Sequence, residues 1–371
     1  MAEEIVFKIG DQLSVDQAMQ LAISEARKGA PFVSPNPLVG CVILDQNQCL
    51  LATGYHKKYG TDHAEVDAFK KLTTDQLQKA IFVVTLEPCA HEGKTPSCAK
   101  ALAKMPIQKV IYGLQDPNPL VSGQGALILK EAGKAVELYQ GAFSEQLEVL
   151  AEIFLKNFRL KKTFVAAKVA SSLDGQIALQ TGQSQWITTE QSREYVHELR
   201  SYYDAILVGR RTIELDNPSL NIRNPQFYKE NKVVVIDPQG KIIQKIAAGQ
   251  NFKFLTVHKD ENIIFAVNKK LQSSFTQVEF SSLEDLLNKL YNLKIMSLFI
   301  EGGAETYSQF LAADLIDRLY LFMNASIIGS SNGLSWTKNF GSTDLKAKKR
   351  LQNLEFKNFG ADLFITGRLK S

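Results

Sequence analysis

The chain has 371 residues, of which 45% are hydrophobic and 22% are charged, and this composition excludes a disordered or fibrous protein. At ~100–200 residues per domain, the length predicts two domains, each with a core of its own. Lys and Arg number 43 and Asp and Glu 39, so the net charge of +4 is too mild for a protein that coats nucleic acid.

The start of the chain and its apolar runs carry no targeting or membrane-spanning signal. The acidic first residues lead into no apolar stretch that resembles a signal peptide. The apolar runs are far shorter than the ~18–20 residues of a membrane helix. Four cysteines are too few for a disulfide scaffold in a chain of this size. We therefore expect a cytoplasmic protein that binds neither nucleic acid nor a membrane.

The first half of the sequence alternates between helical and extended patterns. Apolar residues at 15–26 recur at helical spacing, Ser14 and Gln17 form a capping box before them, and Gly29 ends the helix. Further strands are predicted at 39–44, before residue 56, and at 81–86, 110–114 and 136–138, with helices at 63–72, 96–104 and 126–131. This order predicts a layered α/β domain.

A basic helical stretch at 143–162 separates the two halves, and we expect domains at residues 1–155 and 156–371. Beyond this stretch, strands are predicted at 164–171, 205–208, 233–236, 254–257, 263–267, 297–300 and 319–323, helices at 190–202 and 282–293, and a final hairpin at 354–369. The second half is therefore also predicted to be α/β.

Three residues with metal-binding side chains lie where predicted strands meet predicted helices. His63 opens one helix, Cys89 follows a strand, and Cys98 starts another helix after eight intervening residues. One imidazole and two thiolates suit Zn²⁺ and leave a fourth tetrahedral position for water, as in a catalytic site. Glu65 is placed to take a proton from that water and to deliver it to a leaving amine.

The order His-x-Glu, Pro-Cys, Cys is the signature of zinc deaminases that act on amino-substituted pyrimidine or purine rings. Two other interpretations are weaker. Taken alone, the two cysteines would be interpreted as buried apolar thiols. The presence of His63 and Glu65 in the matching segments favours metal ligands instead. A structural zinc module on a sensing or scaffold protein would need a fourth protein ligand, and the sequence offers no convincing one.

The same segments resemble a known family. Residues 35–41 (Pro-Asn-Pro-Leu-Val-Gly-Cys), 63–66 (His-Ala-Glu-Val) and 85–98 are similar to the amino-terminal half of the bifunctional riboflavin-biosynthesis deaminase/reductase family, RibD, in which the wide cysteine spacing is usual. The resemblance implies a cytidine-deaminase-like three-layer domain. It also implies that Glu65 shuttles protons, that His63, Cys89 and Cys98 bind zinc, and that Asn36, His91 and Lys94 contact substrate.

Four segments of the second half, residues 171–175, 184–188, 203–218 and 298–306, resemble the reductase half of that family. The last runs strand, glycine pair, helix, which could hold a phosphate, although a plain tight turn would be favoured for the pair alone. The resemblance implies a dihydrofolate-reductase-like fold that uses NADPH. The implied NADPH contacts are Ala170, Trp186, Thr212, Asp216, Gly303, Ala304, Glu305 and Thr306. The implied substrate contacts are Ser184, Arg200, Leu220, Arg223 and Glu301.

Three further features are interpreted from the sequence. Arg210 and Arg211 stand where the family more often has small residues, and they either point outward or add contacts to the 2′-phosphate of the cofactor. Gly123 and Gly125 are interpreted as loop residues. Lys168 and Glu301 are hypotheses for assisting the reduction.

The resemblance implies a two-step enzyme. It would deaminate 2,5-diamino-6-ribosylamino-4(3H)-pyrimidinone 5′-phosphate with zinc and then reduce the ribosyl group to ribityl with NADPH, giving 5-amino-6-ribitylamino-uracil 5′-phosphate. The expected partners are this small molecule and, in a homo-oligomer, further copies of the chain. The alternative is another zinc nucleobase deaminase with an unrelated reductase-like or ligand-binding tail, which would leave the motifs of the second half idle.

Overall fold

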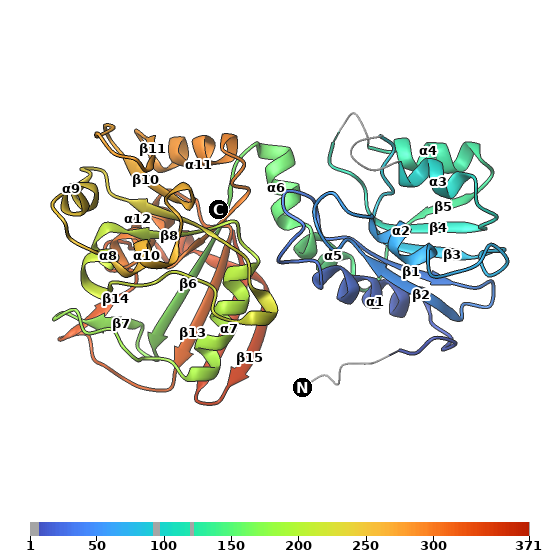
Figure 1. The fold of residues 1–371 in the computed structure, drawn as a ribbon. Helices are drawn as coiled ribbons and strands as arrows, with labels where there is room; N and C mark the ends of the chain where they lie inside the picture. The colour runs from blue at the N-terminus through green and yellow to red at the C-terminus, as the bar shows by residue number, and fades with distance from the viewer. Residues whose placement is uncertain (1–6, 92–96, 119–121, 371) are drawn as a thin grey trace. The chain divides into compact units, whose positions relative to one another are not determined.

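The computed structural model describes residues 7–91, 97–118 and 122–370, and the chain forms two compact units, Met1–Leu160 and Lys161–Ser371 (Figure 1). The boundary expected from the sequence, after residue 155, lies within the last helix of the first unit, and the units divide at the end of that helix. Each unit has its own sheet and its own buried apolar clusters.

The first unit contains, in chain order, α1 (Val15–Arg27), β1 (Gly40–Leu44), β2 (Leu50–Tyr55), α2 (Ala64–Phe69), β3 (Ile81–Leu86), α3 (Cys98–Ala103), β4 (Lys109–Leu114), α4 (Gln124–Glu131), β5 (Ala135–Leu138), α5 (Ser144–Leu150) and α6 (Glu152–Leu160). Helix α1 begins where the sequence predicts, because the Ser14 side chain accepts from the Gln17 N–H and the Gln17 side chain accepts from the Ser14 N–H.

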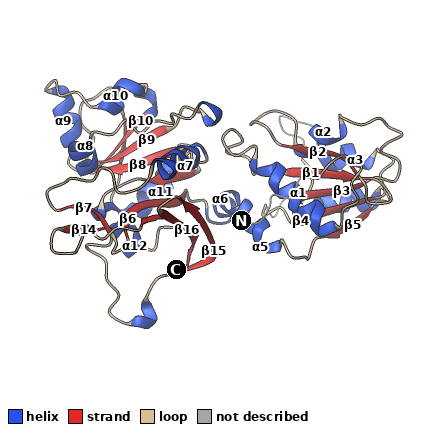
Figure 2. Cartoon of the chain, turned by 90° about the horizontal axis from the view of Figure 1, so that it is seen from below, coloured by secondary structure: helices blue, strands red, loops and turns tan. Residues whose placement is uncertain are grey.

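The strands of the first unit form one sheet in the order β2-β1-β3-β4-β5. Strand β1 is antiparallel to β2 and β3, whereas β3, β4 and β5 are parallel. Met19 of α1 and Leu147 of α5 are buried on one face, and Ala68 of α2, Leu102 of α3 and Leu129 of α4 on the other. Helices therefore cover both faces of the sheet (Figure 2), and the predicted three-layer α/β domain is confirmed.

The second unit contains β6 (Phe164–Ser172), β7 (Gln176–Leu179), α7 (Glu190–Ser201), β8 (Ala205–Gly209), α8 (Arg210–Asp216), η1 (Pro225–Phe227), β9 (Lys232–Ile236), α9 (Lys241–Ala247), α10 (Lys253–Val257), η2 (Asp260–Asn262), β10 (Ile263–Val267), β11 (Thr276–Glu279), α11 (Leu283–Asn292), β12 (Ser297–Ile300), α12 (Ala304–Ala312), β13 (Arg318–Asn324), β14 (Gly333–Ser335), η3 (Leu345–Ala347), β15 (Arg350–Phe359) and β16 (Asp362–Lys370). The predicted final hairpin is β15 and β16.

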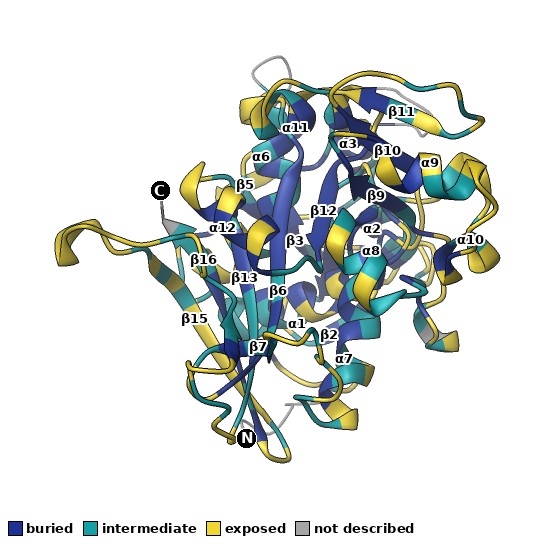
Figure 3. Cartoon of the chain, turned by 90° about the vertical axis from the view of Figure 1, so that its left-hand side faces the viewer, coloured by how far each residue is buried: buried dark blue, intermediate teal, exposed yellow. Residues whose placement is uncertain are grey.

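The main sheet of the second unit has the order β11-β10-β9-β8-β12-β6-β13-β16-β15. In this order, every strand from β11 through β10, β9, β8, β12 and β6 to β13 is parallel to its neighbours. Strand β16 is antiparallel to both β13 and β15. Helices α11 and α12 pack on one face and α8, α9 and α10 on the other. The central strands β6 and β12 are therefore buried, whereas the edge strand β15 is mostly exposed (Figure 3). Parallel strands end at the same edge, where α/β proteins bind ligands.

The prediction of a strand at 254–257 is wrong, because this segment lies in helix α10. Strands β9 and β10 are parallel neighbours, so the chain between them must cross back over the sheet, and α9 and α10 lie in that connection. Phe254 packs into a buried cluster. A short apolar run does not by itself distinguish a buried strand from a buried helix.

Gly125 was expected in a loop and lies instead in the first turn of α4, after Gly123 at the N-cap. A Cβ added to Gly125 would lie 1.9 Å from the carbonyl oxygen of Pro88. Only glycine fits here, because the start of α4 packs directly on the backbone that leads to Cys89.

Candidate active sites

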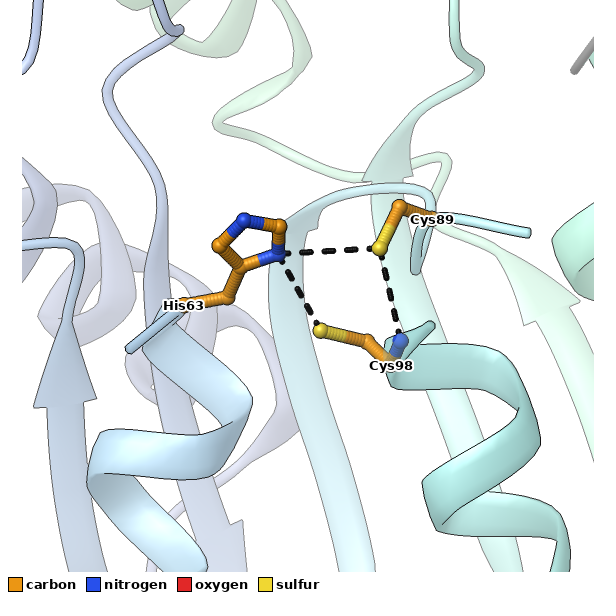
Figure 4. Close-up of side chains that lie close together, drawn as sticks. All are labelled: His63, Cys89 and Cys98. Carbon is orange, nitrogen blue, oxygen red and sulfur yellow. Dashed lines mark hydrogen bonds between the residues drawn. The ribbon is translucent and has the colours of Figure 1, made fainter. Parts of the chain in front are cut away.

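The three predicted zinc ligands lie together in the first unit (Figure 4). His63 is the N-cap of α2, Cys89 follows β3, and Cys98 is the first residue of α3. His63 Nδ1 lies 3.6 Å from Cys89 Sγ and 3.3 Å from Cys98 Sγ, and the Cys98 N–H donates to Cys89 Sγ at 3.3 Å. In the described part of the chain, no fourth side chain belongs to this group.

The donor set fits zinc in chemistry and spacing. With Zn–N and Zn–S bonds of about 2.0 and 2.3 Å, a tetrahedral ion separates its ligand atoms by roughly 3.5 Å. The distances from His63 Nδ1 to the two sulfur atoms are close to this value. Hydrogen bonding from the Cys98 side chain, and then from His63, lowers the pKa of the Cys89 thiol and favours the thiolate that a metal requires.

Glu65, the predicted proton shuttle, lies in the first turn of α2 and is 3% exposed. Burial, and then the charge of Cys89, raise the pKa of its carboxyl to about 7. A carboxyl that gains and loses its proton near neutral pH is suited to acid–base catalysis.

A cavity of about 360 Å³ opens beside these side chains, which is the size of a small-molecule site. Its lining includes the predicted residues Asn36, His63, Glu65, Cys89 and His91. Lys94, the remaining predicted contact, lies outside the described residues.

His56, which the sequence analysis did not single out, holds Asn36 in this cavity. The Nδ1 atom of His56 lies 2.9 Å from the carbonyl oxygen of Asp62, so this nitrogen carries the proton. Burial lowers the pKa of His56 and favours the neutral ring, whose Nε2 then accepts from Asn36 Nδ2 at 3.2 Å. The Oδ1 atom of Asn36 is therefore the acceptor left for a ligand.

Other lining residues were also missed. Asp116 and Asn118 follow β4 at the edge of the sheet that carries Cys89, and polar residues after a parallel strand were a usable signal. Phe154 and Phe158 come from α6, and their ring centroids lie 5.2 Å apart. An aromatic pair on a helix is normally core, so no sequence signal marked them.

In the second unit the first turns of α8 and α12 lie side by side. A Cβ on Gly209 would approach Thr306 Oγ1 to 2.6 Å, and one on Gly303 would lie 3.6 Å from Thr212 Oγ1. Strands β8 and β12 are parallel neighbours, so their carboxyl ends bring these two turns together. Three of the predicted NADPH contacts, Thr212, Gly303 and Thr306, therefore meet at one sheet edge, beside backbone N–H groups that suit a phosphate.

The remaining predicted cofactor residues differ in their surroundings. Asp216 Oδ1 accepts from Ser184 Oγ at 3.0 Å, which joins a predicted cofactor contact to a predicted substrate contact. Trp186 is 66% exposed, with the Arg193 guanidinium 4.5 Å from its ring centroid. At three positions the side chain is poorly available to a cofactor. Ala304 is buried and Ala170 is half-buried on β6. The carboxylate of the exposed Glu305 already accepts hydrogen bonds from Gln309 and Asn339.

Arg200 and Glu301, both predicted to hold substrate, form an ion pair. Arg200 Nε and Nη2 donate to the two oxygens of Glu301 at 2.5 and 2.9 Å, and Lys168 Nζ lies 4.0 Å from the same carboxylate. Burial opposes ionisation of Glu301, but Arg200 outweighs it and lowers the pKa to about 2. Burial lowers the pKa of Lys168. A carboxylate between two cations thus stands at the end of β12.

The two other predicted substrate residues lie near this cluster. The guanidinium Nε of the exposed Arg223 is 3.3 Å from His197 Nε2. His197, another residue that was missed, lies on the same face of α7 as Arg200, and its Nδ1 is 3.4 Å from Arg200 Nη1. Leu220 is 3% exposed and has a φ of 55°, and its carbonyl oxygen accepts from Asn231 Nδ2 at 3.2 Å, so its buried side chain is not available to a ligand.

The structure distinguishes the two consecutive arginines at the start of α8. Arg210 Nη1 donates to Glu214 at 2.6 Å, and its Nε lies 4.0 Å from the buried Asp237. Arg211 is exposed. Arg210 is thus already engaged by carboxylates, and Arg211 points outward.

Comparisons with known proteins cover both units. Residues 14–114 match the cytidine and deoxycytidylate deaminase zinc-binding region, and residues 163–365 match the RibD C-terminal domain. The riboflavin biosynthesis protein RibD of Bacillus amyloliquefaciens is 34% identical over 360 residues, 94% of each chain.

Solved structures agree with these matches. Acinetobacter baumannii RibD superposes with a TM-score of 0.84 at 33% identity, covering 96% of this chain and 99% of that one. A diaminohydroxyphosphoribosylaminopyrimidine deaminase/5-amino-6-(5-phosphoribosylamino)uracil reductase from Thermotoga maritima has a TM-score of 0.83 at 33% identity, covering 95% and 98%. The fold class expected from the resemblance is confirmed. Among the described residues, no helix is both long and apolar enough to cross a membrane.

These matches, over nearly the whole chain, show that it belongs to the RibD family of bifunctional riboflavin-biosynthesis enzymes, which join a zinc-dependent deaminase to an NADPH-dependent reductase.

Proposed function

We propose that the two units act in turn on one ribosylaminopyrimidine phosphate. The first unit removes the 2-amino group of 2,5-diamino-6-ribosylamino-4(3H)-pyrimidinone 5′-phosphate, and the second reduces the ribosyl group of the product to ribityl. The Thermotoga maritima deaminase/reductase, to which this chain is similar, supports this order of substrates.

In the first unit, we assign zinc binding to His63, Cys89 and Cys98. Zinc, when bound, supplies Lewis-acid activation of water for attack on the ring carbon. Glu65 takes the proton from the attacking water and delivers it to the departing amine. The observation that carries this assignment is that the three donor atoms lie together beside a cavity lined by His63, Cys89 and buried Glu65.

The rest of the cavity orients the pyrimidine. Asn36 offers its Oδ1 atom to an N–H group of the ring, because its Nδ2 is turned toward His56 and donates one hydrogen to it. His91 and Lys94 complete the substrate contacts. Lys94 has the charge to meet the phosphate of the substrate.

In the second unit, NADPH supplies a hydride for C1′ of the ribosyl group. The turns at Thr212 and Gly303–Thr306 hold the cofactor, together with Ala170, Trp186 and Asp216. Ser184, Arg200, Leu220, Arg223 and Glu301 hold the substrate. Lys168 Nζ lies 4.0 Å from Glu301 Oε2, so both charged groups stand at the same place in this cluster, which supports their part in the reduction.

Purified chain supplied with the diaminopyrimidinone ribosyl phosphate tests both assignments. Ammonia release should precede loss of NADPH absorbance. Glu65→Gln should stop both, while it still reduces supplied deaminated intermediate. If the zinc-bound wild type releases no ammonia, the cluster at His63 is a structural site.

We further propose a homo-oligomer that works in the cytoplasm without nucleic-acid or membrane partners. The mild net charge of +4 and the scarcity of cysteine support this setting. Light scattering of the purified chain measures the oligomeric state, and a monomer at micromolar concentration would contradict it.

A further inference from the structure

Glu87 is a buried acidic residue beside the zinc ligands that the assignments above do not use. It follows β3, precedes Pro88 and Cys89, and is 4% exposed. In the part of the chain that the structure describes, no cation pairs with its carboxylate. A buried carboxylate without a cation needs hydrogen-bond donors in its place.

Three backbone N–H groups supply those donors. Glu87 Oε2 accepts from Asp116 at 3.2 Å and from Gly123 at 3.0 Å, and Oε1 accepts from Ala126 at 3.2 Å. Gly123 is the N-cap of α4 and Ala126 is its third residue, so the carboxylate also meets the positive end of the helix. Glu87 therefore ties together the end of β3, the segment after β4 and the first turn of α4.

The segment after β4 is the polar wall of the cavity, residues 116–118. Asp116 and Asn118 line the same cavity as Glu65 and Cys89. The Asn118 N–H donates to Asp116 Oδ1 at 2.8 Å, so the direction of the polar wall depends on where the backbone of Asp116 is held. That backbone is held by Glu87.

We infer that Glu87 is a positioning residue of the deaminase, whose carboxylate holds the polar wall at a set distance from the metal ligands and thereby determines affinity for the pyrimidine. The inference rests on the proposed deaminase cavity. It assigns to Glu87 no contact with the reacting atoms and no part in the reduction.

Glutamine is the informative replacement. Its side chain has the same shape but only one oxygen, and its amide N–H₂ cannot accept from a backbone N–H. At least one of the Asp116, Gly123 and Ala126 donors then loses its partner, which loosens the polar wall without removing a metal ligand.

Steady-state deamination of the diaminopyrimidinone ribosyl phosphate by the full zinc-bound chain is the test. For Glu87→Gln we expect KM to rise about 10-fold or more and kcat to stay within about 3-fold. Zinc stoichiometry and reduction of supplied deaminated intermediate should not change. Glu25→Gln is the matched control, because Glu25 is 8% exposed on α1 and does not line the cavity, and its KM should equal that of the wild type.

A double-mutant cycle with Asn118→Ala separates positioning from general destabilisation. If Glu87 acts through the polar wall, the KM of the double variant rises by less than the product of the two single-variant increases. Unchanged KM in Glu87→Gln, loss of bound zinc from that variant, or fully multiplicative effects would overturn the inference.

Two further outcomes are decisive. If Glu87→Gln fails to fold, Glu87→Asp is tested instead. Aspartate keeps the negative charge, but its side chain is one methylene shorter, so its oxygens lie farther from the three N–H donors. A raised KM at unchanged kcat then supports the inference, and an unchanged KM overturns it. A wild-type chain that releases no ammonia overturns the deaminase assignment itself, and this is read before any variant is made.

Discussion

Arg200 on α7 and Glu301 at the end of β12 form a bidentate ion pair, with donor–acceptor distances of 2.5 and 2.9 Å. Their side chains are only 13% and 10% exposed, so water screens the pair little. Because Lys168 also approaches Glu301, the three charges form one unit between a helix and two strands. Removing Arg200 takes away the hydrogen-bonded partner of buried Glu301 and leaves only Lys168, at 4.0 Å, to compensate its charge.

Arg200→Gln should therefore destabilise the second unit by about 3–5 kcal/mol, as expected when one partner of a buried pair is removed. It should also abolish most reductase activity. Urea unfolding followed by tryptophan fluorescence measures the loss, since both tryptophans, Trp186 and Trp336, lie in this unit.

Lys259→Gln is the control for this prediction. It breaks the Lys259–Glu230 pair, whose side chains are 65% and 52% exposed, and should cost no more than about 1 kcal/mol. Equal losses in the two variants would mean that the Arg200 pair contributes no more than a surface contact.

The second unit should lose stability on the acid side from about pH 6.5 downward. Burial, with Arg200 and Arg223, lowers the pKa of His197 from 6.5 to about 4, so the unfolded chain binds a proton in this window that the native chain does not. Glu301 adds a second loss between pH 4.5 and 2, because its folded pKa is lowered to about 2.

Unfolding free energies from tryptophan fluorescence at pH 7, 6, 5 and 4 check this dependence. The wild type should fall more steeply than His197→Gln between pH 6.5 and 4. Parallel curves for the two proteins would show that His197 titrates alike in the folded and unfolded chains.

Zinc removal should separate the two reactions. Cys98→Ala leaves His63 and Cys89 as the remaining members of the donor set, and ammonia release should fall by more than about 100-fold with loss of bound zinc. Reduction of supplied deaminated intermediate should persist. Cys41→Ala, in the buried strand β1, is the control and should keep its zinc. A zinc-free Cys98→Ala protein that still deaminates would exclude the metal from the reaction.

His56 should matter for substrate affinity and not for zinc binding. His56→Phe keeps a ring of similar shape but frees the amide of Asn36, so KM for deamination should rise about 10-fold, the effect of one lost hydrogen bond. His258→Phe is the matched control, because His258 also bonds a backbone carbonyl, that of Ser219, but in the second unit. A normal KM in His56→Phe would show that Asn36 needs no support.

The sequence alone determined many of the local elements and the chemistry of the metal-binding side chains. The apolar stripe of α1 with its capping box and the alternation of strands and helices are properties of near neighbours in the chain, and the order and spacing of His63, Glu65, Cys89 and Cys98 can be read along it. Period and spacing report such properties directly. The family resemblance then extended them to the reductase half.

Only the tertiary structure decided which distant residues meet. Residues 254–257 are helical because two parallel strands require a crossover. His56, Asp116 and Phe158 share a cavity although they are far apart in the chain, and Glu87 serves as an anchor because α4 begins beside it. Such contacts depend on strand order and on the packing of whole layers, which no local pattern encodes.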